Sequence, residues 1–186
     1  MKRITLFLFL ILVFFGWVAP VQAFEMRQGT DVTVDKDTVV KGTLLAGGST
    51  VSIDGTVDGD LFCAAQTVVI RGKVNGDVIC AVQTMTIYGS VTGSVRTMSQ
   101  LLDIAGSVKR NVMALGQTVV VQPSSVISGE LMMAGQTVNI KGNWIRNSAN
   151  TFTQGTTLIN VNGAAVQSLG GTQPTSFINI TINNTS

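Results

Sequence analysis

Apolar residues recur at every second position through most of the chain, in short units that repeat. Alternation with a period of two is typical of a β-strand with one buried face, whereas an amphipathic helix has a period of 3.6. The unit reads G-D-L-x-C/A-x-x-Q-T-V-x-I-x-G-x-V-x and is clearest from Gly59 to Val74 and from Gly76 to Val91. The pattern therefore predicts short strands joined by turns.

Glycine sets the length of the unit at 17 residues. One glycine column consists of Gly42, Gly59, Gly76 and Gly93, and Gly129 resumes it after Arg110 and a two-residue insertion. A second column follows 13 positions behind, as Gly55, Gly72, Gly89 and Gly106, then Pro123 and Gly142. We expect these glycines at the corners of the coils, where they supply a positive φ.

A unit of this length cannot bury its own apolar face, but coils stacked about 4.8 Å apart form one continuous core. Four buried columns are predicted: Leu61, Val78, Val95, Val112 and Leu131; Val51, Val68, Met85, Leu102, Val119 and Val138; Ile53, Ile70, Ile87, Ile104, Val121 and Ile140; and Val57, Val74, Val91 and Val108. The predicted fold is all-β, a right-handed parallel β-helix built as a three-sided solenoid with coils of about 17 residues.

The N-terminus has the features of an export signal. Lys2 and Arg3 precede an apolar run from Ile4 to Ala19, and Val21-Gln22-Ala23 then offers small side chains for cleavage. This run of 16 residues is shorter than the roughly 20 that a membrane helix needs. We expect residues 1–23 to be a signal peptide, so the protein is exported to the periplasm, the cell envelope or the outside, and meets a membrane only if the signal stays uncleaved.

The β-helix is expected over residues 24–146, and residues 147–186 leave two interpretations open. The V-x-I-x-G signal returns weakly in Ile159–Gly163 and in Ile178–Ile182, at spacings of 21 and 19, which indicates degenerate terminal coils. The same segment has no charged residue after Arg146 and is rich in Asn, Thr, Gln and Gly, which indicates a low-complexity polar tail.

Charge and composition exclude several function classes. Removing Lys2 and Arg3 from the 12 basic residues leaves ten, against ten acidic residues, which argues against a nucleic-acid partner. Histidine is absent, so sites that depend on an imidazole base or metal ligand are excluded. We predict no cofactor, no metal and no catalytic residue.

Cys63 and Cys80 are 17 residues apart and occupy the same position in adjacent coils, so they are predicted to be stacked neighbours. Export permits a disulfide, and the expected spacing of the Cα atoms suits one. However, side chains in register on parallel strands project alongside one another, and the bond would require twisting. Buried free thiols are the favoured interpretation.

Two polar columns have both a structural and a functional interpretation. Glutamines recur as Gln66, Gln83, Gln100, Gln117 and Gln136, and we favour a ladder of stacked amides over a glycan-binding surface. Asp58, Asp60 and Asp77 lie beside corner glycines, where two carboxylates could cleave a polysaccharide. Aspartate at such corners is a turn former first, and no acidic cluster or aromatic platform accompanies these residues, so we favour the structural role.

With the repeat in place, Val68–Val78 resembles the units of the bactofilins, a family of polymer-forming bacterial cytoskeletal proteins. The resemblance covers about Gly42 to Gly142. It implies a three-sided β-helix that polymerises end to end without nucleotide and acts as a scaffold for the cell envelope. Bactofilins are typically cytosolic, so the export signal is a departure from the family.

An open β-helix must cap or pair the backbone groups of its end coils. Asp31–Asp37 is charged as a cap would be, whereas the C-terminal end is the expected assembly interface through Phe152, Phe177, Ile178, Ile180 and Ile182. The function expected is an exported, self-assembling scaffold whose partners are copies of itself, with envelope proteins or glycans as further candidates. The alternatives are a surface adhesin or carbohydrate-binding β-helix and, third, an enzyme of polysaccharide cleavage.

Overall fold

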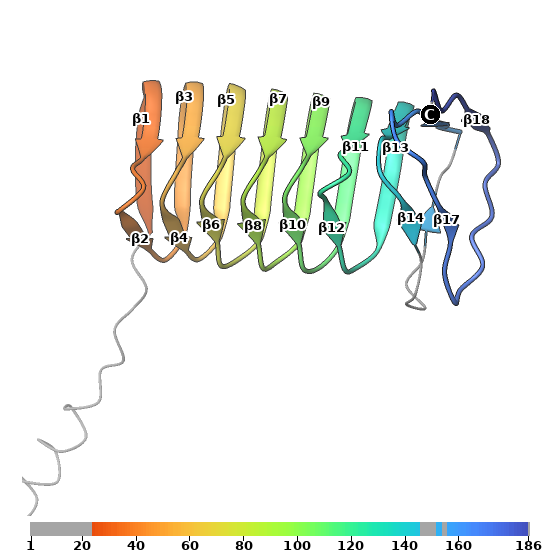
Figure 1. Ribbon diagram of the computed structural model, residues 1–186. Helices are drawn as coiled ribbons and strands as arrows, with labels where there is room; N and C mark the ends of the chain where they lie inside the picture. The colour runs from red at the N-terminus through yellow and green to blue at the C-terminus, as the bar shows by residue number, and fades with distance from the viewer. Residues whose placement is uncertain (1–23, 146–151, 154–155, 186) are drawn as a thin grey trace, which may run out of the picture.

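The computed structural model describes residues 24–145, 152–153 and 156–185. Seven ten-residue strands stack side by side along the long axis of the molecule (Figure 1). They are β1 (Glu25–Val34), β3 (Leu44–Ile53), β5 (Leu61–Ile70), β7 (Val78–Ile87), β9 (Val95–Ile104), β11 (Val112–Val121) and β13 (Leu131–Ile140). Each strand is parallel to its neighbours, and corresponding residues of successive units lie opposite each other.

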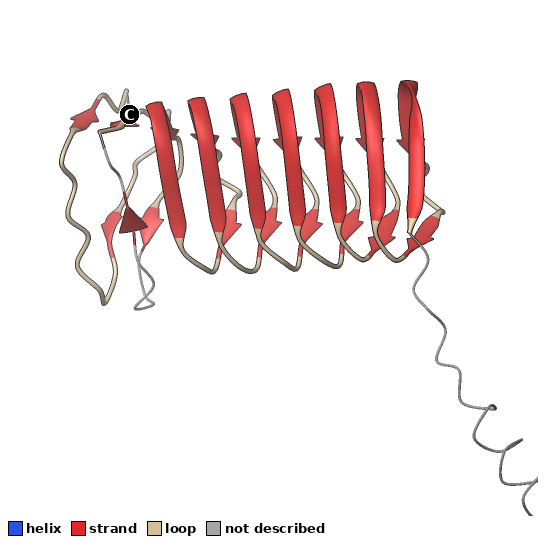
Figure 2. Ribbon diagram, turned by 180° about the vertical axis from the view of Figure 1, so that it is seen from behind, coloured by secondary structure: helices blue, strands red, loops and turns tan. Residues whose placement is uncertain are grey.

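A short strand follows each long one and builds a second parallel sheet of six strands. These are β2 (Val39–Lys41), β4 (Thr56–Asp58), β6 (Lys73–Val74), β8 (Ser90–Val91), β10 (Ser107–Val108) and β12 (Val126–Ile127). The described residues contain strands and loops but no helix (Figure 2). Because each coil hydrogen-bonds to the next in register, the chain is the predicted β-solenoid; its right-handed winding stays a prediction.

Each long strand turns a corner and so lines two sides of the coil. In β5 the buried side chains are Leu61 and Cys63 in the first part but Val68 and Ile70 in the second, so the alternation changes phase between them. The register passes over Gln66 at this point, which places Gln66 at the corner. We call the first part side one and the second part side two; the short strand is side three. The coil is therefore three-sided, as predicted.

The four predicted apolar columns form the core. Every member is buried except Val121, which is partly buried and packs against the core cluster. The columns also extend to β1 and β2, where Val32, Val34 and Val40 are buried in positions that the repeat assigns to the core. A continuous apolar interior along the axis supplies the stability that no single coil has.

The corner glycines are needed for a different reason from the one predicted. Among the described residues only Gly42 and Gly171 have a positive φ, with values of 88° and 123°. At Gly72 a Cβ atom would collide with the carbonyl oxygen of Gly55, and at Gly89 with that of Gly72. The column is therefore glycine because backbones of successive coils approach too closely for a side chain, so the expectation of positive φ at the corners is wrong for all but Gly42.

Insertions between coils fall in turns and leave the ladder intact. The coils from β1 to β3 and from β11 to β13 are two residues longer than the four coils between them, because residues 35–38 and 122–125 form wider turns before β2 and β12. The Asp35–Thr38 turn is closed by a hydrogen bond from the Thr38 amide to the Asp35 carbonyl at 2.8 Å. Extra length is absorbed where backbone groups can bond locally.

The main sheet continues into the C-terminal segment. The strands there are β14 (Trp144–Ile145), β15 (Phe152–Thr153), β16 (Leu158–Val161), β17 (Leu169–Gly170) and β18 (Ile180–Ile182). Strand β16 pairs with β13, and β18 pairs with β16, so the described tail adds two shorter turns to the solenoid. Ile159 lies opposite Ile180 and not Ile178, so the predicted spacing of 19 is corrected to 21.

Candidate assembly surfaces

The last coil leaves apolar side chains of the core columns uncovered. Ile180 and Ile182 continue the columns of Ile159 and Val161, which are fully buried. Because no described coil covers β18, Ile180 is 36% exposed and Ile182 is 64% exposed. The backbone edge of β18 is the terminal edge of the main sheet. The C-terminal end therefore offers both apolar side chains and an open strand edge.

The other residues predicted for this interface have different positions. Ile178 is 72% exposed and lies just before β18. Phe177 packs on the core, with its ring edge-on to Trp144 at a centroid distance of 5.8 Å. Phe152 belongs to β15, whose backbone pairs with Leu131 of β13; its side chain lies outside the described residues. The structure thus places Ile180 and Ile182 on the last strand and Ile178 just before it, while Phe177 packs inward against the core and Trp144.

The first coil, by contrast, has an ion pair over the core. Glu25 and Arg27 occupy the columns that Leu44 and Ala46 continue in the next coil. The Arg27 Nε donates to Glu25 Oε1 at 2.7 Å, and its Nη1 donates to the carbonyl oxygen of Thr33 at 2.7 Å. Since Arg27 lies on side one and Thr33 on side two, the guanidinium spans the open end of the coil. Charged groups in core columns at an end discourage pairing with another strand.

The predicted cap is Asp31–Asp37, whereas the charged pair in the core columns is Glu25 and Arg27, which the prediction does not include. The signal was present: both residues fall in the buried columns when the repeat is extended backwards by 19 residues from Leu44 and Ala46. The two-residue insertion in the Asp35–Thr38 turn concealed this relation.

The two cysteines form a disulfide. Strands β5 and β7 place Cys63 directly opposite Cys80, with their Cα atoms 4.6 Å apart, which is within the range for a disulfide. The predicted stacking is confirmed, and the favoured interpretation of free thiols is corrected. The bond joins adjacent coils on side one, where both residues are 5–6% exposed.

The five glutamines lie in successive coils at the corner between sides one and two. All five are exposed: Gln66, Gln83, Gln100, Gln117 and Gln136. Within the described residues their amides form no hydrogen bond with one another. They therefore make a polar edge along the solenoid and do not close a bonded ladder in this structure.

The aspartates at the corners bind the backbone of the following coil. Asp60 Oδ1 accepts from the Asp77 amide, and Asp77 Oδ1 accepts from the Ser94 amide, each at 2.7 Å. A Cβ atom at Gly76 would collide with Asp60 Oδ1, so the repeated Gly-Asp pair makes room for this contact. Asp58 accepts instead from the Asn75 side chain at 2.9 Å. The carboxylates act as links between coils.

Asp77 is also held in its ionised form. The hydrogen bond from the Ser94 amide and then the ion pair with Arg96, 2.7 Å away, lower the pKa of the Asp77 carboxyl below its usual value. A general acid needs a raised pKa at neutral pH, so this carboxyl does not suit that role. Within the described part of the chain, no three potential ligands gather to hold a metal.

Residues 32–102, from β1 into β9, match the family model Bactofilin, which is described as polymer-forming cytoskeletal. This part of the chain is similar to the bactofilins. The bactofilin family is a structural, polymer-forming family and not an enzyme family. No curated protein and no solved structure matches the chain.

The match covers the regular coils from the end of β1 into β9, and it stops well before the C-terminal end where Ile180 and Ile182 are exposed. The ion pair of Glu25 and Arg27 likewise lies just before the matched residues. In the described residues no helix is long and apolar enough to cross a membrane. The residues that match the bactofilin model thus lie between the two ends of the solenoid and include neither of them.

Proposed function

We propose that this protein is an exported, bactofilin-like structural protein that self-assembles through its ends and serves as a scaffold of the cell envelope or surface. Its family supports polymer formation, and the export is inferred from the signal-like residues 1–23. The single observation that carries the mode of assembly is the exposure of Ile180 and Ile182 in core columns at the C-terminal end.

The contact follows from the geometry of β18. A second copy that presents its own β18 covers the isoleucines of both copies and pairs two open strand edges. Because the N-terminal end carries the ion pair of Glu25 and Arg27, the C-terminal coil of another copy is the better partner for this surface. Such a contact is isologous, since the same residues meet from both sides.

The test uses protein purified from bacterial cells that express the full chain, with its N-terminus determined by mass spectrometry. Negative-stain electron microscopy and sedimentation, without nucleotide or metal, then measure assembly. We expect a mature chain that begins near Phe24, recovered outside the cytosol, and assemblies that contain at least the dimer formed by the end contact. A stable monomer at high concentration would overturn self-assembly, and a cytosolic chain that retains Met1 would overturn export.

A further inference from the structure

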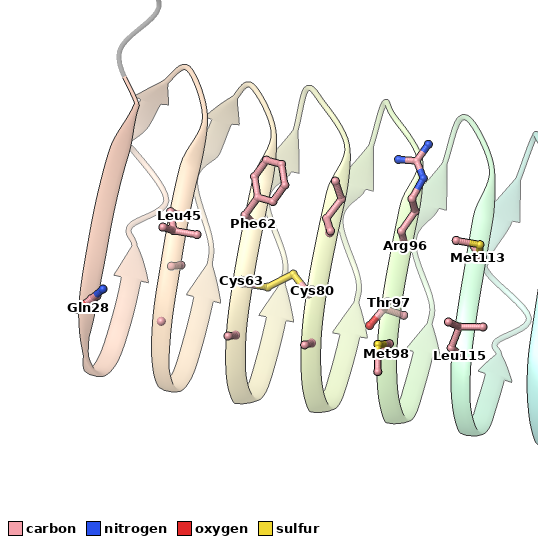
Figure 3. A pocket seen from close by; sticks show the side chains of 15 residues that line it. Gln28, Leu45, Phe62, Cys63, Cys80, Arg96, Thr97, Met98, Met113 and Leu115 are labelled. Atoms are coloured by element: carbon pink, nitrogen blue, oxygen red, sulfur yellow. A yellow bond between two sulfur atoms is a disulfide. The ribbon is translucent and has the colours of Figure 1, made fainter.

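Side one of the solenoid has an outer surface with almost no charge. Its outward residues form two columns along the axis, both in register across the coils. The first column has large apolar residues, among them Leu45, Phe62, Ile79 and Met113. The second begins with small residues, Gly47, Ala64 and Ala81, and continues with Met98 and Leu115. We call these two columns together the apolar face (Figure 3).

The charged groups of the regular coils are concentrated elsewhere. Arg71 pairs with Asp54 at 3.0 Å on the turn after side two, Asp103 projects from side two, and Lys73 lies on side three. From β3 to β13 the outward residues of side one include a single charge, Arg96, which is paired with Asp77. A water-exposed sheet face normally carries polar residues, and a bare apolar one marks a contact surface.

The first column of the apolar face projects as a ridge, and the small residues of the second column form a trough beside it. Gly47, Ala64 and Ala81 form the floor of a groove of about 590 Å³, above the disulfide of Cys63 and Cys80. Phe62 and Ile79 stand beside this floor and are 37% and 36% exposed. Met98 occupies the next floor position as a larger side chain, 63% exposed. The face therefore has both a projecting apolar row and a recess next to it.

We propose that the apolar face packs against the same face of a second copy of this chain. A two-fold axis that lies in the plane of the contact, parallel to the solenoid axis, places the ridge of each copy, centred on Phe62 and Ile79, over the trough of the other. Two flat sheets stack in this way about 10 Å apart in proteins. The ridge and trough lie on one surface, so the match is reciprocal, as an isologous contact requires.

The area is that of a weak contact. Six coils about 4.8 Å apart and about five residues at 3.3 Å per residue give roughly 480 Å² per copy. Two copies thus bury roughly 950 Å², which is in the range of weak and transient interfaces. A single pair is then weak, but contacts repeated along an assembly add up through high effective concentration.

The pairing of faces goes beyond the end contact proposed above and does not depend on it. An isologous end contact alone joins two copies and then stops. A second isologous contact on the side of the solenoid lets each pair bind further pairs, and the two contacts together produce an open polymer when their two-fold axes do not intersect. The apolar face thus supplies the second contact that such a polymer requires.

The experiment isolates the face in a full-length protein whose end is blocked by Ile180→Asp and Ile182→Asp. Analytical ultracentrifugation of this variant is expected to show a monomer–dimer equilibrium. Adding Phe62→Lys should weaken the dimer at least tenfold, whereas Val69→Lys should leave it unchanged. Val69 is the matched control because it is an outward apolar residue of the same strand, on side two. Circular dichroism and thermal unfolding verify that each variant is folded.

A second measurement does not rely on adding charge. A photo-crosslinking amino acid at position 62 should link two copies, and the same group at position 69 should not. A monomeric end-blocked variant, or a dimer insensitive to Phe62→Lys, would overturn the pairing. Binding of the monomer to zwitterionic phospholipid vesicles through Phe62 would also overturn it, and would make the face a lipid-binding surface.

The end contact and the face contact fail in different ways. In the otherwise unchanged protein, Phe62→Lys should leave end-to-end dimers, whereas Ile180→Asp with Ile182→Asp should leave side-by-side dimers. If Ile180→Asp with Ile182→Asp does not change assembly, the proposed end contact is wrong. The effect of Phe62→Lys on the face contact can still be measured in that case.

Discussion

At its N-terminal end the solenoid places Glu25 and Arg27 in core columns, whereas at its C-terminal end it places Ile180 and Ile182 in core columns without a further described coil above them. The stacking rule is the same at both ends, because each residue lies in register with a buried residue of the adjacent coil. Only the chemistry of the side chain differs. The contrast indicates that the end of a repeat is specified by substitutions within its columns.

The strands at the two ends also differ in length. Strand β1 has ten residues and pairs with β3 over its whole length, apart from the corner. Strand β18 has three residues and pairs only on side two. A long strand edge is a strong template for pairing, so its exposure requires protection. Arg27 provides such protection by donating to Thr33, whereas the short β18 presents a small surface suited to one defined partner.

The largest expected effect comes from charging the C-terminal end. Ile180→Asp combined with Ile182→Asp removes the burial of two isoleucine side chains, each worth roughly 1.5–3 kcal/mol when complete. We therefore expect the concentration for half-maximal end contact to rise by about a hundredfold or more, measured by sedimentation in a Phe62→Lys background.

The matched control for this variant is Thr181→Asp. Thr181 lies between the two isoleucines in β18, and its side chain alternates to the opposite face. The same charge at this position should leave the end contact nearly unchanged. Equal loss of assembly in both variants would mean that β18 does not present its core columns to the partner.

A smaller effect is expected from removing the N-terminal ion pair. Glu25→Leu with Arg27→Ala restores the residue types that the same columns have in Leu44 and Ala46. This opens a second apolar end, so assembly should occur at about tenfold lower concentration, as expected for burying one leucine. Light scattering at a series of protein concentrations measures the change.

The control exchanges the two charges, as Glu25→Arg with Arg27→Glu. Both charges remain at the end of the core, so assembly should stay as in the unchanged protein. Assembly of the apolar variant at an unaltered concentration would show that Glu25 and Arg27 do not limit pairing at this end.

The regular coils were predictable because each column contains one residue type many times. In the column from Ile53 to Ile140, isoleucine occupies the same position in five of six coils, so the one exception, Val121, does not obscure the pattern. The positive φ at the glycines was predicted wrongly because the repeat shows where a side chain is excluded but not what excludes it. That cause, the backbone of the preceding coil, is a contact between residues 17 positions apart.

The ends were less predictable, because each occurs once and next to an insertion. The wide turn at Asp35–Thr38 separated Glu25 and Arg27 from their columns, and the longer C-terminal coils shifted the match from Ile180 to Ile178. The apolar face is hard to predict for another reason. The buried alternation dominates the repeat, whereas the outward residues between the buried ones, such as Phe62 and Ile79, change in type from coil to coil and show no common motif.

The smallest expected effect tests whether the middle of the solenoid responds to pH without affecting its ends. The Ser94 amide and Arg96 lower the pKa of the Asp77 carboxyl in the folded chain. The ionised carboxylate therefore stabilises the folded chain at pH values above 3.8, which is the pKa of this group in the unfolded chain. This contribution is lost as the pH falls below 3.8 through the folded-state pKa. For a partly exposed ion pair we expect about 1 kcal/mol or less, a few degrees in melting temperature.

Asp77→Asn is the informative variant, because Asn111 already makes the equivalent bond in a later coil, accepting from the Glu130 amide at 2.9 Å. The asparagine should retain the link to Ser94 and lose the ion pair, so its melting temperature should fall less than that of the unchanged protein between pH 4 and pH 2.5. Parallel melting curves would contradict the role of the charge. In the Phe62→Lys background, sedimentation at pH 7 should be identical with and without Asp77→Asn, since Asp77 lies far from the C-terminal end contact.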